Sequence, residues 1–122
     1  MDDEPMVADF AKACLIHHGY RPSLFTDPQL ALDSFRAAPG RYAAVVTDLT
    51  MPRLSGLDLL GAIRTQQPLM PAVILTGYGS EDARENISRL PRCLLLPKPF
   101  SGEDLAQTLN KVLTGKASPV TA

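Results

Sequence analysis

The sequence has few of the features that mark several large protein classes. Only two of its 122 residues are cysteines, Cys14 and Cys93, and both lie in apolar stretches. Two are too few for a disulfide scaffold and predict reduced core residues of a cytosolic protein. The net charge of −1 offers no electrostatic case for nucleic acid. No apolar run approaches the length of a membrane span, and the N-terminus is acidic, unlike a secretory signal.

The chain also has no internal repeat, no glycine loop that would cradle a nucleotide phosphate and no dinucleotide fingerprint. Its length corresponds to one ordinary domain. The composition after Leu113 is that of a linker. We therefore predict one domain over residues 1–113 and a flexible tail over 114–122.

Helical and strand-like hydrophobic periods alternate along the chain. Helices are predicted at 5–19, 28–38, 55–63, 80–90 and 101–113, and strands at Tyr20–Phe25, Ala43–Asp48, Ala72–Thr76 and Cys93–Leu96. Short strands that are apolar throughout and joined by helices indicate a parallel sheet covered on both faces. Right-handed crossovers then give a flavodoxin-like, doubly wound α/β fold of the (βα)5 type.

Asp48 ends an apolar run, and the chain breaks into a loop directly after it. A polar residue where a buried strand ends is in the usual place for a ligand site of an open α/β sheet. The acidic pair Asp2 and Asp3 opens the chain, and Lys98 lies between two prolines near its end. Together these residues predict a cation-dependent phosphoryl site.

Four motifs now point to a family: Asp-Asp-Glu-Pro, Val-Thr-Asp-Leu-Thr-Met-Pro-Arg-Leu-Ser-Gly, Ile-Leu-Thr-Gly-Tyr and Pro-Lys-Pro-Phe. All four occur in order, each at the end of an expected strand. From Asp2 to about Leu113 the chain resembles the receiver domain of two-component response regulators. Within that family it looks most like receivers attached to hybrid sensor histidine kinases.

The resemblance implies a role for each site residue. Asp48 matches the phosphoryl-accepting aspartate, Asp3 a direct Mg²⁺ ligand and Asp2 a ligand acting partly through water. Thr50 matches the residue whose backbone carbonyl completes the metal shell. Thr76 matches the hydroxyl that bonds the phosphoryl group, and Lys98 the lysine that pairs with one of its oxygens.

The resemblance also implies a signalling switch and not an enzyme. A phosphohistidine of a sensor histidine kinase or phosphotransfer protein would supply the phosphoryl group. An output protein would contact the face made by the fourth helix, the last strand and the last helix. Direct contact with nucleic acid or membrane is not expected.

Elementary chemistry supports the same roles. Each pair of carboxylates held ~4 Å apart costs on the order of 4 kcal/mol at an effective dielectric near 20, so three of them need a cation. Mg²⁺ suits a site of oxygen ligands and waters. A carboxylate is a competent nucleophile toward phosphorus, and the transfer needs mainly alignment and charge neutralisation.

Other interpretations stay open. Asp48 can instead cap the turn before Pro52. The N-terminal acidic residues can belong to a frayed terminus, and Lys98 can be an ordinary solvent-exposed turn residue. A receiver-like interaction module that is not usefully phosphorylated is the second hypothesis. The third is a phosphatase with Asp48 as its nucleophile, although such enzymes carry a second acid two residues later, where this chain has Thr50.

The chain departs from the family pattern at two places. Family members carry four or five apolar residues before the acidic pair, as a central first strand, whereas here Met1 precedes Asp2 directly. Losing four buried aliphatic side chains removes on the order of 10 kcal/mol of hydrophobic stabilisation from the folded state. We therefore expect the first strand to be missing or truncated, with a start upstream, a clipped boundary or another segment in the gap. Leu95 also stands where the family often has an aromatic switch residue.

Overall fold

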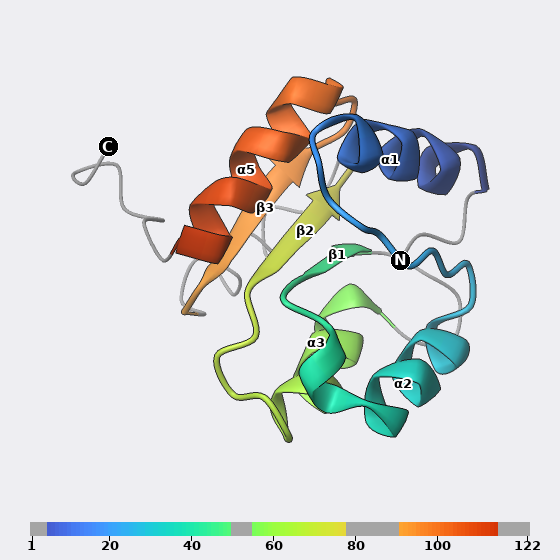
Figure 1. Ribbon diagram of the computed structural model, residues 1–122, viewed down its shortest axis with the longest axis vertical. Helices are drawn as coiled ribbons and strands as arrows, with labels where there is room; N and C mark the ends of the chain where they lie inside the picture. The colour runs from blue at the N-terminus through green and yellow to red at the C-terminus, as the bar shows by residue number, and fades with distance from the viewer. Residues whose placement is uncertain (1–4, 50–54, 78–90, 115–122) are drawn as a thin grey trace.

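The computed structural model describes residues 5–49, 55–77 and 91–114 (Figure 1). The helices are α1 (Pro5–His17), α2 (Pro28–Ala37), α3 (Gly56–Arg64) and α5 (Gly102–Thr114), with a short 3₁₀ turn at Pro39–Arg41; the strands are β1 (Val45–Asp48), β2 (Ala72–Thr76) and β3 (Cys93–Pro97). Within this described part, no helix is both long and apolar enough to cross a membrane.

The three strands form a parallel sheet in the order β1-β2-β3. Asp48 is in register with Leu75, and Thr76 with Pro97. All five residues of β2 are buried, as expected for the central strand of a covered sheet. The carboxyl ends of the three strands therefore lie along one rim.

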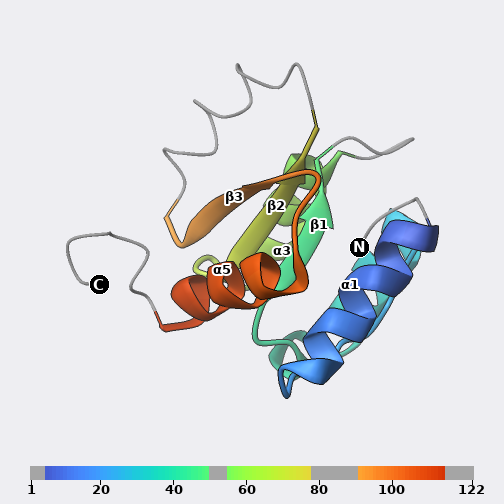
Figure 2. The ribbon, with the colours of Figure 1, turned by 90° about the horizontal axis from the view of Figure 1, so that it is seen from above.

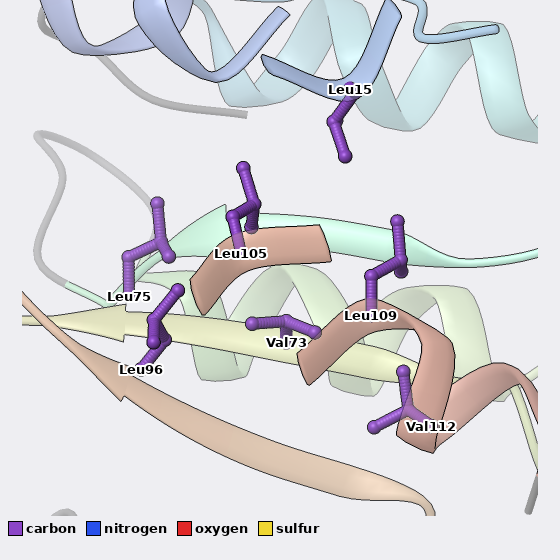
Figure 3. Close-up of a cluster of buried hydrophobic side chains, with 7 residues drawn as sticks. All are labelled: Leu15, Val73, Leu75, Leu96, Leu105, Leu109 and Val112. Atoms are coloured by element: carbon purple, nitrogen blue, oxygen red, sulfur yellow. The ribbon is translucent and has the colours of Figure 1, made fainter. Parts of the chain in front are cut away.

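Helices cover both faces of the sheet, α1 and α5 on one side and α2 and α3 on the other (Figures 1 and 2). Figure 3 shows the core under α1 and α5, made by Leu15, Val73, Leu75, Leu96, Leu105, Leu109 and Val112. Two further apolar clusters fill the other face, where α2 and α3 pack. The predicted doubly wound α/β arrangement is confirmed.

Capping residues explain where the helices begin. The Asp27 side chain accepts a hydrogen bond from the Gln29 amide at the start of α2. Ser55 accepts one from the Asp58 amide at the start of α3. Ser101, directly before α5, and Asp104, in its first turn, hydrogen-bond reciprocally through side chain and backbone amide, as in a capping box.

One predicted strand is wrong. Tyr20–Phe25 is not in a strand in the structure, although the segment follows α1 where the strand was expected. A strand needs a hydrogen-bonded neighbour. Within the described sheet, β1 pairs only with β2, so nothing described there lies beside Tyr20–Phe25 as a ladder partner.

Other boundaries differ less. The last helix reaches Thr114, one residue past the predicted domain end. The predicted fourth helix at 80–90 and the tail at 115–122 lie outside the described residues. The segment ahead of α1, where the first strand was expected to be missing or truncated, lies outside the described residues, so that expectation stays a prediction.

Candidate functional site

Three polar side chains lie at the carboxyl-terminal rim of the sheet, one from each strand or its end. Asp48 is the last residue of β1, Thr76 is the last residue of β2, and Lys98 directly follows β3. Since the strands are parallel neighbours, the fold brings residues 28 and 22 positions apart in the sequence to one edge. Such rims are the usual ligand sites of α/β sheets.

Asp48 and Lys98 form an ion pair. The Lys98 Nζ lies 3.3 Å from Asp48 Oδ1, with the aspartate side chain 8% exposed and the lysine side chain 22% exposed. Charges this poorly hydrated attract more strongly than at an open surface. Lys98 therefore stabilises the ionised carboxylate, which is the nucleophilic form.

Thr76 is buried at 1% exposure, and its hydroxyl has no hydrogen-bond partner among the described residues. An unsatisfied buried hydroxyl costs about 1–3 kcal/mol, so such groups call for a functional explanation. The Thr76 carbonyl accepts a hydrogen bond from the Lys98 amide at 2.7 Å. This bond fixes Lys98 beside the end of β2, and the hydroxyl is available to a ligand at the rim.

Gly56 supports the site, and sequence reasoning assigned it no role. A Cβ at this position would lie 2.2 Å from the Asp48 carbonyl oxygen. The Gly56 amide also donates to the Leu49 carbonyl at 2.8 Å. The first residue of α3 therefore packs directly on the backbone of Asp48 and Leu49. A glycine just after a serine N-cap was the available signal, since helix interiors disfavour glycine.

The remaining predicted site residues, Asp2, Asp3 and Thr50, lie outside the described residues. Among the residues that are described, no group of three or more histidine, cysteine or acidic side chains is placed to hold a metal. Asp48 supplies a hard oxygen donor of the kind that Mg²⁺ prefers. Asp48, the one member of the predicted donor set that the structure describes, thus fits the cation.

The opposite rim has a structural role. Arg64 at the end of α3 donates to the carbonyls of Met70 at 2.8 Å and Pro91 at 2.6 Å, just ahead of β2 and β3. Burial lowers the pKa of Arg64, and the neighbouring Arg92 adds to this. Burial likewise raises the pKa of the Cys93 thiol to about 11. Cys93 is therefore a neutral core residue at ordinary pH, as predicted.

Comparison with known proteins decides the family. The model of the response regulator receiver domain matches residues 1–110. The chain belongs to this family. The receiver is 32% identical over 114 residues to the transcriptional regulatory protein FixJ of Bradyrhizobium diazoefficiens, covering 93% of this chain and 54% of FixJ. It is 33% identical over 119 residues to the response regulator MprA of Mycolicibacterium vanbaalenii, covering 93% of this chain and 48% of MprA.

Solved structures share the fold. A response regulator receiver domain protein from Clostridium thermocellum superposes with a TM-score of 0.87 at 29% identity, covering 95% of this chain and 92% of that one. Full-length FixJ from B. japonicum gives a TM-score of 0.80 at 31% identity, covering 98% and 58%. The flavodoxin-like fold predicted from the sequence is thus confirmed. The receiver spans about half the length of the curated relatives it matches.

Proposed function

We propose that this receiver domain is a phosphorylation-dependent switch that accepts a phosphoryl group on Asp48. The observation that carries the proposal is the Asp48–Lys98 ion pair, 3.3 Å long, at the rim of the parallel sheet. The Thr76 hydroxyl at the end of the neighbouring strand, which has no hydrogen-bond partner among the described residues, adds to it. Together they offer a nucleophile, a cation and a hydrogen-bond donor.

The transfer exchanges one bond to phosphorus for another. A carboxylate oxygen of Asp48 attacks the phosphorus of a phosphohistidine, the P–N bond breaks, and the imidazole leaves with that electron pair. The acyl phosphate carries more negative charge than the carboxylate and adds strong acceptor oxygens. Lys98 pairs with one of these oxygens, and Thr76 donates its hydroxyl hydrogen to another.

The Thr76 hydroxyl gains a hydrogen-bond acceptor on phosphorylation, and this gain provides the switch. Before transfer, the buried Thr76 hydroxyl has no hydrogen bond among the described residues; after transfer, it has a strong acceptor. Gly77 follows directly and is exposed. Phosphorylation then acts on the chain at the end of β2, and through it on the predicted output face around the fourth helix, β3 and α5.

Mg²⁺ is part of the proposal. Its ligands would be Asp2, Asp3, Asp48 and the backbone carbonyl of Thr50. The bound cation supplies charge neutralisation for the transferring phosphoryl group. Asp48 fits this role as a hard oxygen donor.

The partner would be a sensor histidine kinase or phosphotransfer protein. The finer likeness to receivers of hybrid sensor kinases gains no support from FixJ and MprA, which are named as a transcriptional regulatory protein and a response regulator. A non-enzymatic role, a cytoplasmic location and the absence of direct nucleic-acid contact stay predictions.

Acetyl phosphate labelling tests the proposal. With Mg²⁺, intact-mass spectrometry should show one added phosphoryl group on the full chain, and chelating the metal should prevent it. Asp48→Asn should remain unlabelled, whereas Asp58→Asn, an exposed acid on α3, should label as the parent does.

The same experiment separates the competing functions. A parent chain that acquires no label would favour the interaction module. Continuous turnover of generic phosphate esters that Asp48→Asn abolishes would favour the phosphatase. Either result would contradict the switch.

A further inference from the structure

Arg92 lies directly before β3, at the rim of the sheet opposite to the Asp48–Lys98 ion pair. Its guanidinium Nη2 donates to the carbonyls of Val112 and Leu113, at 3.4 and 3.3 Å, in the last turn of α5. The start of β3 and the end of α5 lie side by side at this rim (Figure 1). Arg92 therefore connects the last helix to the last strand, and we call its two hydrogen bonds the Arg92 clamp.

The Arg92 clamp satisfies carbonyls that the helix cannot satisfy by itself. The last four carbonyls of an α-helix have no amide partner within the helix. Within α5, the Thr114 hydroxyl donates to the Lys111 carbonyl at 3.2 Å. Arg92 donates to the next two carbonyls, from 20 and 21 positions earlier in the chain. A cation at this end of a helix also interacts favourably with the helix dipole, so Arg92 acts as a C-terminal cap of α5.

Three features show that the Arg92 clamp is weak. Both of its hydrogen bonds are longer than the roughly 2.7–3.2 Å of ordinary N–H···O bonds. The backbone φ of Arg92 is 50°, in the left-handed region that glycine adopts without steric cost and other residues do not. The Nε of Arg92 is buried and has no hydrogen-bond partner within residues 5–49, 55–77 and 91–114. A small displacement of Arg92 relative to α5 is therefore enough to break the clamp.

The other hydrogen bonds at the start of β3 are shorter. The Ala72 amide donates to the Arg92 carbonyl at 3.0 Å, where the ladder between β2 and β3 begins. Arg64, at the end of α3, donates to the Pro91 carbonyl at 2.6 Å. The start of β3 is therefore held firmly to β2 and to α3, and its hydrogen bonds to α5 are the first to break if α5 and the sheet shift relative to each other.

The same two strands reach the phosphoryl site at their other ends. Thr76 ends β2, Lys98 directly follows β3, and the Lys98 amide donates to the Thr76 carbonyl at 2.7 Å. Because β2 and β3 are paired along their whole length, they move together. A phosphoryl group on Asp48 attracts both Lys98 and Thr76, so the two strands shift toward it. Arg92, roughly 20 Å along the chain from Lys98, then moves away from the last turn of α5.

We propose that the Arg92 clamp is a releasable cap, which holds the last turn of α5 while Asp48 is unmodified and opens when Asp48 is phosphorylated. This inference rests on the phosphoryl transfer to Asp48 proposed above, and it adds the point at which the signal reaches the end of α5. Opening deprives the carbonyls of Val112 and Leu113 of their donor. The last turn of α5 then frays and is released from the start of β3.

Amide hydrogen exchange of the full chain, measured by NMR in the presence of Mg²⁺, tests the proposal. Beryllofluoride serves as the probe, because it occupies the place of the phosphoryl group on an aspartate. It should lower the protection of the Leu113 and Thr114 amides about threefold or more. The amide of Leu109, which is buried in the middle of α5, should keep its protection.

Matched variants assign the effect to Arg92. Arg92→Met removes the donors, so the last turn should be poorly protected from the start and should not respond further to beryllofluoride. Acetyl phosphate should label Asp48 in this variant at least as well as in the parent, since the clamp favours the unmodified state. Arg92→Gly also removes the donors and fits the left-handed backbone, so the test survives if Arg92→Met fails to fold. Arg36→Met, at an exposed position in the last turn of α2, should behave as the parent does.

Three results would overturn the proposal. If the parent is labelled on Asp48 but beryllofluoride leaves the last-turn protection unchanged or raises it, Arg92 is a fixed structural cap and the proposed function still stands. If both Arg92 variants respond to beryllofluoride as the parent does, another contact carries the change. If the parent acquires no label from acetyl phosphate, the proposed function and this inference fail together.

Discussion

The buried Thr76 hydroxyl has no hydrogen-bond partner among the described residues, and this predicts opposite effects on stability and on phosphorylation. Thr76→Val removes the unsatisfied hydroxyl while keeping the β-branched shape, so the free energy of unfolding should rise by about 1 kcal/mol. The lifetime or yield of the phosphorylated form should fall, because the new oxygen loses its donor. Urea unfolding and acetyl phosphate labelling measure the two effects.

Thr47 on β1 is the matched control. It is equally buried, but its hydroxyl donates to the Asp48 carbonyl at 3.1 Å. Thr47→Val should therefore destabilise the domain. Stabilities that change in the same direction for both substitutions would contradict the role assigned to Thr76.

Lys98 is the cation beside the nucleophile. Lys98→Met keeps most of the alkyl chain and removes the charge, so labelling of Asp48 should slow about tenfold or more, which corresponds to about 1.4 kcal/mol of the barrier. Lys111→Met, an exposed position on α5, should label at the parent rate. Unchanged labelling kinetics in Lys98→Met would contradict a role for Lys98 in the phosphoryl transfer.

Cys93 predicts a pH dependence of stability. Burial raises its pKa to about 11 from an ordinary value near 9, so the folded state holds this proton more tightly than the unfolded state. The stabilisation that the neutral Cys93 thiol gives the folded state is fully present below about pH 9 and is lost as the pH rises through about 11. Because lysines and tyrosines titrate in the same range, the measurement is the difference between the parent and Cys93→Val. That difference should narrow or reverse in favour of the variant between these pH values, and a constant difference would contradict the prediction.

At the scale of elements, the close contact between α3 and β1 positions the nucleophile. Gly56→Ala forces a Cβ against the Asp48 carbonyl, so the free energy of unfolding should fall by about 1–3 kcal/mol and labelling should slow. Gly61, on the same helix, has nothing within 4 Å of its hypothetical Cβ. Gly61→Ala should instead stabilise the domain by about 0.5–1 kcal/mol. Thermal unfolding of the two variants checks the contrast, and equal melting temperatures would contradict the close packing.

Sequence patterns predicted those elements whose signals are local. The predicted helices at 28–38 and 55–63 form as α2 and α3, within one residue of those bounds, and the apolar runs at β2 and β3 form the expected strands. The strand predicted at Tyr20–Phe25 was wrong because a strand needs a neighbouring strand to pair with. Short-range periodicity in the sequence does not show whether that neighbour is present. Gly56 was missed for a related reason, since its role depends on a contact with residues seven and eight positions earlier in the sequence.

At the scale of the whole molecule, the parallel sheet explains why the site was partly predictable. Parallel strands bring their carboxyl ends to one rim, so Asp48, Thr76 and Lys98 could be grouped before their contacts were known. The ion pair at 3.3 Å confirms that Asp48 and Lys98 meet. The burial of Thr76 and its unpartnered hydroxyl depend on packing around β2 and were not predictable from the sequence.

The most direct test of the central claim is NMR of the full chain with Mg²⁺ and beryllofluoride, a mimic of the phosphoryl group on aspartate. We expect the resonances of Thr76 and Lys98 to shift together at one saturating concentration, with no shift in Asp48→Asn. Shifts that persist in Asp48→Asn, or a parent in which Thr76 and Lys98 do not respond, would contradict the claim that these three residues form one phosphoryl-accepting site.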